Sequence, residues 1–384
     1  MKRIIFSLFT ACVALNVIGM CQDTTSSKSS SSLKTIPMVV EEHPVVGTIT
    51  NLTRVEKPKE GPMVTYSHVD VLKGCCALSY SPVIELEKLE ETDDVRLFFR
   101  EITHSESSFA GLTKKVGTTL VVAFPGTRTS HSMGTLMSDV KADISGLGSD
   151  GGFVTTLANT LAKKDIVAYP GFSKEVMLFY NEMFRRISSY DGISEIHFTG
   201  HSKGGGISIL SALKYAVDSR VRFVKPSIKV FTFAAPPVLN AVGVDFFHDI
   251  IGEYNAICIY NNTDIVPYSS MFFSLFSWWG KDSSYRHVGI QANISKTMSK
   301  ASDVKAEAEK IIADGIANGW SMSLAAKHLL KLSLASHGLD SFSCEAIREV
   351  MQRMRGRYSV NPYMDRNEIG RDATPFFASL MFWK

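Results

Sequence analysis

The sequence lacks a strong excess of positive or negative charge, and this argues against partners that are bound through a highly charged surface. Its 384 residues carry 41 Lys and Arg against 38 Asp and Glu, a formal net charge of +3. A nucleic-acid-binding surface needs clustered positive charge, often with interleaved aromatic side chains, because phosphate contacts dominate the affinity. No basic stripe of that kind occurs, so we expect no nucleic-acid partner.

Metal-ligand spacing and internal repeats are also absent. Histidines and cysteines are scattered and do not form the close pairs that hold zinc, so we predict no metal site. Beyond residue 21 only four cysteines remain, Cys75, Cys76, Cys258 and Cys344. They permit one or two disulfides whose connectivity the sequence does not give.

One apolar run lies at the very start of the sequence. Residues 1–3 are Met-Lys-Arg, residues 4–20 are mostly apolar, and residues 26–32 are rich in serine. This order is typical of a secretory signal peptide, whereas a membrane span needs about 20 apolar residues. We predict a signal peptide over 1–21, a flexible Ser-rich tether and lead-in over 22–60, and a secreted or extracytoplasmic protein.

Cys21 offers an alternative interpretation of the same region. A cysteine directly before a flexible tether is the position of a bacterial lipoprotein anchor. Met20 stands where a small residue is expected before that cysteine, which disfavours the anchor.

A Gly-His-Ser-Lys-Gly-Gly segment at 200–205 carries the clearest chemical signal. Residues 195–199 read as a short buried strand, and residues 207–217 read as a helix. A serine between a strand and a helix, in a G-x-S-x-G turn, is held in strained geometry that presents its hydroxyl. Short Gly/Ser turns are common, so the motif alone would equally fit a plain loop. Its flanking elements and the partners below favour Ser202 as a nucleophile.

A serine nucleophile needs a base and an acid that orients the base, in the chain order Ser, Asp or Glu, His. The apolar run 256–260 reads as a strand, and Asp264 follows it in a polar turn closed by Pro267. His287, His328 and His337 all come later, so the order is satisfied by more candidates than needed.

An oxyanion hole is predicted on the N-terminal side of the Ser202 motif. Residues 118–124 read as an apolar strand that leads into a Gly-Thr turn at 126–127. Backbone N–H groups and hydroxyls at such a turn can point at a developing oxyanion. We assign the donors to Thr127 and to the backbone N–H of Lys203, the residue after the nucleophile.

Five blocks of the sequence resemble the class 3 (fungal-type) lipases, an α/β-hydrolase family. Residues 122–127 resemble its oxyanion strand and turn, residues 169–172 its VHxGF block, and residues 200–205 its GHSLGG elbow. Residues 232–238 and 264–267 resemble its TFGxPRVG and DxVP blocks, although 234–237 lack the usual Gly and Arg, Pro125 replaces an Arg, and Lys203 replaces a Leu.

The resemblance implies an α/β fold of the α/β-hydrolase type, with a mostly parallel central sheet flanked by helices. The blocks extend from about residue 95 to 345, so we place the hydrolase domain at 61–345 and a C-terminal extension packed on it at 346–384. A lid follows the oxyanion turn in this family. Residues 133–144 read as a helix, and the glycine-rich stretch 146–152 suits a hinge. The alternative is a surface excursion that does not move.

The base must be chosen between His337 and His287. Residues 336–342 resemble the family's H-x-L-x-x-Y block, which supplies the base, with Phe342 in place of Tyr. Residues 285–289 resemble another block of the family, which usually does not supply the base. We therefore predict His337 as the base and keep His287 as the alternative. If His287 is not the base, we expect it to have a structural role near the acid turn. His328 reads as an ordinary helix residue.

Two aromatic runs have open interpretations. Residues 271–279 fit a pocket wall or lipid contact as well as they fit core, and residues 375–383 fit packing onto the domain.

The resemblance implies a serine ester hydrolase (a lipase) that cleaves acylglycerol or phospholipid esters and needs no cofactor. Ser202 attacks, His337 moves the proton and Asp264 orients the base. The expected partners are a lipid substrate and, transiently, a lipid or membrane surface. One alternative is a soluble-ester esterase or acyltransferase with the same triad. The other is a catalytically inactive lipase-fold binding protein, which the ordered nucleophile, acid and base disfavour.

Overall fold

The structure is a computed structural model. It describes residues 66–92, 95–103, 106–127, 153, 166–218, 220, 226–261, 264, 266–268, 285–294, 310, 314, 318 and 337–350.

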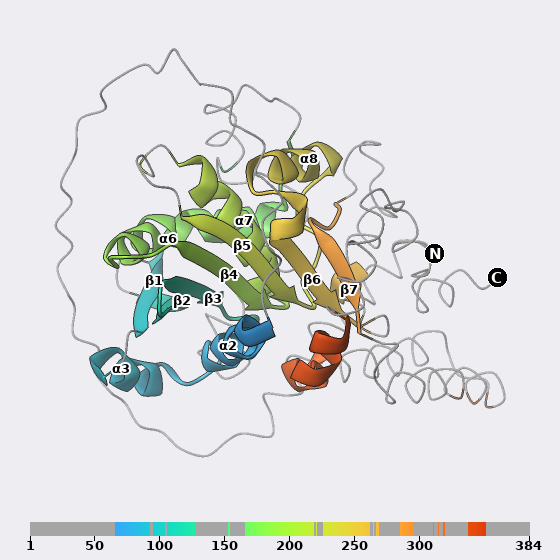
Figure 1. The fold of residues 1–384 in the computed structure, drawn as a ribbon, viewed down its shortest axis with the longest axis horizontal. Helices are drawn as coiled ribbons and strands as arrows, with labels where there is room; N and C mark the ends of the chain where they lie inside the picture. Colours follow the sequence, from blue (N-terminus) through green and yellow to red (C-terminus); the bar gives the residue numbers. More distant parts are fainter. Residues whose placement is uncertain are drawn as a thin grey trace, which may run out of the picture.

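A seven-stranded sheet in the order β1-β2-β3-β4-β5-β6-β7 forms the centre of this region (Figure 1). The strands are β1 (Val95–Thr103), β2 (Glu106–Val116), β3 (Thr119–Phe124), β4 (Glu195–His201), β5 (Ser227–Phe233), β6 (Ala256–Tyr260) and β7 (Ile290–Asn293). β2 is antiparallel to both of its neighbours, and all pairs from β3 to β7 are parallel. The sheet is thus mostly parallel, as predicted.

Helices cover both faces of the sheet. α6 (Pro170–Ser188), α7 (Lys203–Val217) and α8 (Ala241–Ile250) lie on one face, and α2 (Tyr66–Leu78) and α3 (Val83–Thr92) lie on the other (Figure 1). α7 packs against β3, β4 and β5, and α2 packs against β3 and β4. Among the residues that the structure describes there are three single-turn 3-10 helices: η1 (Glu253–Asn255), η2 (Val266–Tyr268) and η4 (Leu339–Ser341). A helix at 344–350 follows η4.

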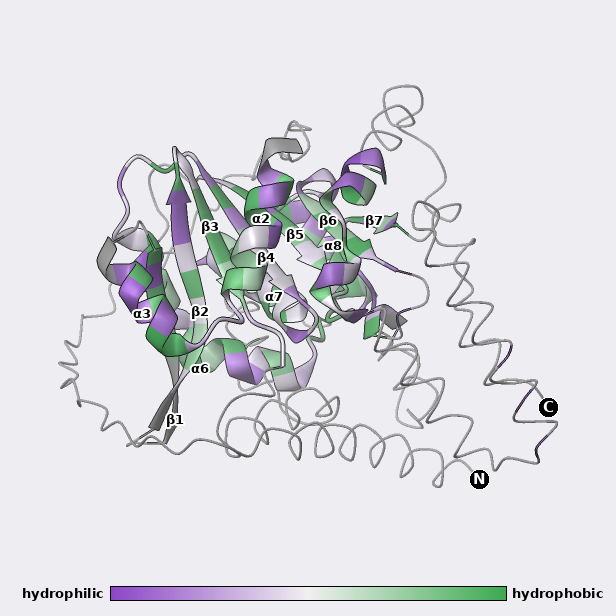
Figure 2. Ribbon diagram, turned by 90° about the horizontal axis from the view of Figure 1, so that it is seen from below, coloured by the Kyte–Doolittle hydropathy of each residue, from purple (hydrophilic) through white to green (hydrophobic). Residues whose placement is uncertain are grey.

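The apolar strands explain the two layers. All six residues of β3 are buried, because a parallel strand covered on both faces is apolar throughout its length. Successive side chains still alternate in direction. Val122 faces the core with α6 and α7, while Val121 faces the core with α2. In Figure 2 the strands at the centre of the sheet are largely hydrophobic.

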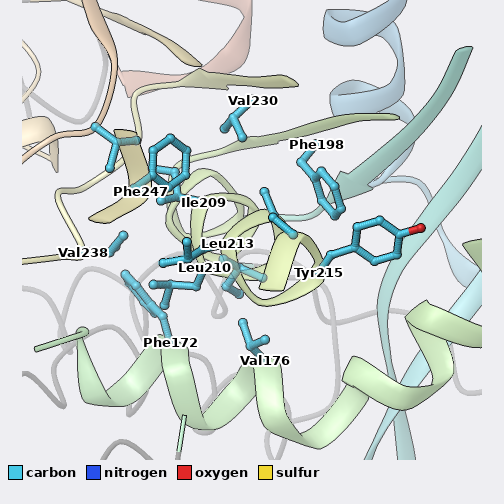
Figure 3. Close-up of a cluster of buried hydrophobic side chains, with 14 of the residues drawn as sticks. Phe172, Val176, Phe198, Ile209, Leu210, Leu213, Tyr215, Val230, Val238 and Phe247 are labelled. Atoms are coloured by element: carbon cyan, nitrogen blue, oxygen red, sulfur yellow. The ribbon is translucent and has the colours of Figure 1, made fainter. Parts of the chain in front are cut away.

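The core between α6, α7 and the sheet holds the larger cluster of apolar side chains. Phe172 and Val176 of α6 point toward Leu210 and Leu213 of α7, and Phe198 lies on the strand side (Figure 3). This packing fixes the helix that begins directly after Ser202.

Several elements differ from the sequence-based expectations. α7 begins at Lys203, four residues before the predicted start at residue 207. α3, β2, β5, α8 and β7 were not predicted as elements. Ile347 and Val350, at the start of the predicted C-terminal extension, pack against the face that α2 covers.

Other predictions fall outside the described residues. These are the signal peptide and tether at 1–60, the lid at 133–152, His328, and the aromatic runs at 271–279 and 375–383. No helix in the described residues is long and apolar enough to span a membrane. The four cysteines beyond residue 21 are all described, and none forms a disulfide.

Candidate active site

The carboxyl ends of three parallel strands bring the predicted site residues to one edge of the sheet. Thr127 follows β3, Ser202 follows β4, and Asp264 follows β6. Because β3 through β7 run parallel, these ends meet at the edge where open α/β sheets place their ligands. His337 reaches the same edge from far along the chain, just before η4.

The turn at Ser202 has the strained geometry of a nucleophile elbow. Ser202 has φ 59° and ψ −129°, and it is one of two residues other than glycine with a positive φ in the described chain. Such a conformation is costly for a residue with a Cβ and persists only where the surroundings hold it. The hydrogen bond from the Ser202 N–H to the Phe233 carbonyl, 2.9 Å long, ties the elbow to β5.

Close packing of α7 on the sheet requires a glycine next to the elbow. A Cβ at Gly204 would lie 2.3 Å from the Phe124 carbonyl oxygen and 2.6 Å from that of Pro125. Both atoms are backbone, so neither can move aside cheaply. The first turn of α7 can therefore approach the end of β3 only because residue 204 has no side chain.

A chain of two hydrogen bonds joins Ser202, His337 and Asp264. His337 Nε2 lies 2.8 Å from Ser202 Oγ, and His337 Nδ1 lies 2.6 Å from Asp264 Oδ2. A carboxylate accepts, so Nδ1–H donates to Asp264 and Nε2 is left to accept from the serine hydroxyl. The Asp264 side chain is fully buried, while the His337 side chain keeps 14% of its surface exposed.

The backbone of the acid turn holds Asp264 in place. The Val266 N–H donates to Asp264 Oδ1 over 2.9 Å, and the Asp264 N–H donates to the Asn261 carbonyl over 3.1 Å. One carboxylate oxygen is thus fixed by the turn, which leaves the other oriented toward His337. Hydrogen bonds from N–H groups also favour the charged form of a carboxylate.

His287 lies beside the acid turn but makes a different contact. Its Nε2–H donates to the Pro267 carbonyl over 2.7 Å, and its buried Nδ1 has no hydrogen-bond partner among the described residues. Burial lowers the pKa of His287 to about 4. The structure therefore brings His337, and not His287, to Ser202.

The two predicted oxyanion donors flank the elbow. Thr127 is half-buried in the turn after β3, and β3 pairs with β4 up to Phe124 opposite Gly200. Lys203 is the first residue of α7, and the first N–H groups of a helix have no partner within it. The partial positive charge of the helix N-terminus favours a negative oxygen at this place.

A buried ion pair accounts for the lysine that replaces the family's usual leucine. Lys203 Nζ lies 3.1 Å from Glu175 Oε1, and both side chains are buried. A buried charge without a partner is costly, so Glu175 on α6 makes the substitution tolerable. No sequence pattern predicted this pair, because its two members come from different helices and match no motif.

Two further residues at the site were not predicted. His201 contacts both Tyr80 and the segment that carries His337. His201 lies inside the elbow motif, so its position could have been noticed from the sequence. Tyr80 has no motif around it, and only the fold brings it near. In the described residues, no group of three or more His, Cys, Asp and Glu side chains could hold a metal ion.

Comparisons with known proteins bear on the chemistry of this site. The model of the family "Lipase (class 3)" matches residues 121–273. A search of curated proteins returned no match. Among solved structures, a triacylglyceride lipase from Rhizomucor miehei is 16% identical, with 61% of this chain and 82% of that chain covered and a TM-score of 0.41.

Two other lipase structures are similar to a comparable extent. A lipase from Rhizopus microsporus var. chinensis is 17% identical, with 65% of this chain and 85% of that chain covered and a TM-score of 0.41. A lipase from Yarrowia lipolytica is 14% identical, with 60% of this chain and 81% of that chain covered and a TM-score of 0.40.

The family match contains the oxyanion turn, the elbow and the acid turn. It therefore confirms the resemblance to the class 3 lipases, and this chain is a lipase-type hydrolase with an α/β-hydrolase fold.

Proposed function

We propose that this protein is a secreted serine ester hydrolase that cleaves acylglycerol or phospholipid esters. The observation that carries the proposal is the hydrogen-bonded chain from Ser202 through His337 to Asp264. Its distances lie in the range at which a general base activates a nucleophile.

In the first half of the reaction, the Ser202 oxygen attacks the ester carbonyl. His337 Nε2 takes the hydroxyl proton as the new C–O bond forms, and Asp264 stabilises the resulting imidazolium. The carbonyl oxygen becomes an oxyanion, which the Lys203 N–H and the Thr127 turn stabilise. When the tetrahedral intermediate collapses, the ester C–O bond breaks and the imidazolium gives its proton to the leaving alcohol.

The second half of the reaction releases the acyl group. Water attacks the acyl-enzyme, and His337 takes its proton. Collapse of the second intermediate frees the carboxylic acid and returns the proton to Ser202. No step needs a metal or a cofactor, since the protons circulate between Ser202, His337, water and the alcohol.

The lipid substrate and the secreted location are proposed on separate grounds. The family match supports a lipase-type substrate, and the pattern at residues 1–21 supports export. An exported enzyme of this type would meet its substrate at a lipid surface.

A lipid panel tests the substrate class. Wild type and Ser202→Ala are assayed on emulsified triacylglycerol, diacylglycerol and monoacylglycerol, on phospholipid vesicles, and on a soluble short-chain ester. We expect fatty acid release from at least one lipid, with a sharp rise in rate once the substrate passes from monomers to aggregates. Ser202→Ala is expected to lower the rate by roughly a million-fold.

Each alternative predicts another pattern. Hydrolysis of the soluble ester alone, with smooth saturation across the solubility limit, would indicate a soluble-ester esterase. Ester exchange with an added alcohol in preference to hydrolysis would indicate an acyltransferase. A folded wild type that hydrolyses none of the substrates would indicate an inactive binding protein.

A further inference from the structure

Tyr80 and His201 form a hydrogen-bonded pair next to His337, and neither takes part in the proposed reaction steps. The Tyr80 hydroxyl is 2.8 Å from His201 Nδ1, and His201 Nε2 is 2.6 Å from the backbone carbonyl oxygen of His337. Tyr80 follows α2, and His201 is the last residue of β4. His201 therefore links the segment after α2 to the backbone of His337.

The directions of these two hydrogen bonds follow from the groups that make them. A carbonyl oxygen only accepts, so His201 Nε2 carries the proton and donates to His337. Neutral imidazole has one N–H, which leaves Nδ1 to accept from the Tyr80 hydroxyl. Burial, and then the nearby His337, lower the pKa of His201 to about 3. His201 is therefore neutral and in a single tautomer at neutral pH.

The rings of the two histidines are also in contact. Their centroids are 4.7 Å apart with an angle of 35° between the planes. Phe342 packs edge-on against His201, with the ring centroids 6.2 Å apart. His201 thus holds both the backbone of His337 and one face of its ring.

The Tyr80 hydroxyl also lies against the predicted oxyanion turn. A Cβ built on Gly126 would be 2.0 Å from the Tyr80 oxygen and 2.9 Å from the His201 carbonyl oxygen. The same hydroxyl therefore borders the turn that carries Thr127 and supports the histidine that holds His337.

We propose that Tyr80 and His201 are positioning residues that hold His337 in register with Ser202 and Asp264. Tyr80 fixes the tautomer of His201, and His201 then donates to the His337 carbonyl. Neither residue touches the substrate or the reacting atoms. This inference rests on the proposed function, in which His337 is the general base.

The energetic reason is that a flipped tautomer would be repulsive. Without the Tyr80 hydroxyl, His201 loses the donor that favours an unprotonated Nδ1. The other tautomer would point an Nε2 lone pair at the His337 carbonyl oxygen, at a distance where two acceptors repel. Displacement of a catalytic group by about 1 Å can lower a rate by roughly 100-fold.

Tyr80→Phe removes only the hydroxyl and is the central test. We expect kcat on an ester substrate, and the rate of labelling by a fluorophosphonate, to fall by roughly 10- to 100-fold. KM is expected to stay unchanged, because Tyr80 does not bind substrate. The two rates should fall together, since both depend on activation of Ser202 by His337.

Tyr180→Phe is the matched control. The Tyr180 hydroxyl donates to Asp218 over 2.8 Å, the same length as the Tyr80 bond. Asp218 is the residue that ends α7. It lies about 24 Å from Ser202 at the rise of an α-helix. This variant loses a comparable hydrogen bond, so we expect lower stability with kcat unchanged.

Two substitutions at His201 separate positioning from packing. His201→Gln keeps an N–H donor that can reach a carbonyl, and His201→Phe keeps a ring but has no donor. We expect His201→Gln to retain a larger share of kcat than His201→Phe at equal KM. The opposite ranking would assign His201 a packing role only and overturn the proposal.

The tautomer of His201 can be observed directly. Two-bond ¹H–¹⁵N spectra of ¹⁵N-histidine-labelled Ser202→Ala are expected to show His201 protonated at Nε2 only, and the added Tyr80→Phe change is expected to mix the tautomers. Protonation at Nδ1, or spectra that Tyr80→Phe leaves unchanged, would overturn the proposal. An active wild type whose kcat is insensitive to Tyr80→Phe overturns the positioning role alone. A wild type that neither hydrolyses esters nor reacts with the fluorophosphonate overturns the proposed function and this inference with it.

Discussion

At the scale of single residues, two histidines near Asp264 make different contacts and should respond differently to substitution. His337 bonds to both Ser202 and Asp264, whereas His287 bonds to the Pro267 carbonyl. We expect His337→Ala to lose as much activity as Ser202→Ala. His287→Ala is expected to keep much more activity and to lower the free energy of unfolding by about 1–3 kcal/mol, because it orphans a buried carbonyl. Steady-state kinetics and chemical denaturation measure the two effects.

The assignment of the base depends on the order of these two losses. Greater loss of activity from His287→Ala than from His337→Ala, with both variants folded, would exchange the two roles. Equal loss from both would mean that His287 acts on the acid turn strongly enough to control Asp264.

Some residues of the site could be predicted from the sequence and others could not. Ser202 and Asp264 were accessible because each follows an apolar strand in a short turn, and parallel strands place such turns at one edge. His337 could be chosen as the base only through the family resemblance, because His287 and His328 also follow Asp264 and satisfy the same chain order. Tyr80 and Glu175 left no local pattern, because their partners lie 121 and 28 residues away.

At the scale of elements, the approach of α7 to the end of β3 positions the elbow against the oxyanion turn. Gly204→Ala would place a Cβ 2.3 Å from the Phe124 carbonyl oxygen, so the helix must move away from the strand. We expect a loss of stability of about 1–3 kcal/mol, together with a loss of activity, because the Lys203 N–H moves with the helix. Thermal denaturation and ester hydrolysis check the two effects.

Gly74→Ala is the control for this substitution. Gly74 lies in α2 with nothing within 4 Å of an added Cβ, so alanine there is expected to stabilise the protein by up to about 1 kcal/mol. A Gly204→Ala variant as stable and active as the Gly74→Ala variant would show that the close approach is not needed.

Elements were predictable where their residues are uniformly apolar. The runs that became β3 and β6 were recognised because parallel strands buried on both faces have this composition. β4 was recognised from its place directly before the elbow motif. β2 was missed because its second half, with Thr113, Lys114 and Lys115, lacks such a run. The start of α7 was placed too late because glycine is a poor helix former, and packing against β3 overrides that preference.

At the scale of the whole molecule, three buried histidines should make stability depend on pH. Burial lowers the pKa of His197, His201 and His287 to about 4, about 3 and about 4. Below the ordinary pKa of about 6.5, the unfolded chain binds protons at these positions while the native state does not. Stability is therefore complete above that pH and falls as the pH drops toward 4.

Denaturant unfolding at pH 7.5 and pH 5 measures this effect. Each histidine is expected to contribute at most about 2 kcal/mol of lost stability at pH 5. His197→Gln, which does not titrate and keeps a donor for Glu195, should remove about a third of the total loss. Equal stability of the wild type at the two pH values would contradict the burial of these neutral rings.

The fold class was predictable at this scale because the order of blocks along the chain matches the order of strands across the sheet. Of the C-terminal extension predicted at 346–384, the structure describes residues 346–350. Ile347 and Val350 join the core against the α2 face, but the resemblance to the family's blocks ends near residue 345. The apolar residues of a helix do not by themselves indicate which face of the sheet the helix covers.

The central claim is that Ser202 is the nucleophile of an ester hydrolase, and intact mass spectrometry after treatment with a fluorophosphonate tests it most directly. The account predicts one adduct on the wild type, located by peptide mapping at Ser202, and none on Ser202→Ala. An adduct that persists on Ser202→Ala, or one on the wild type at another residue, would contradict it.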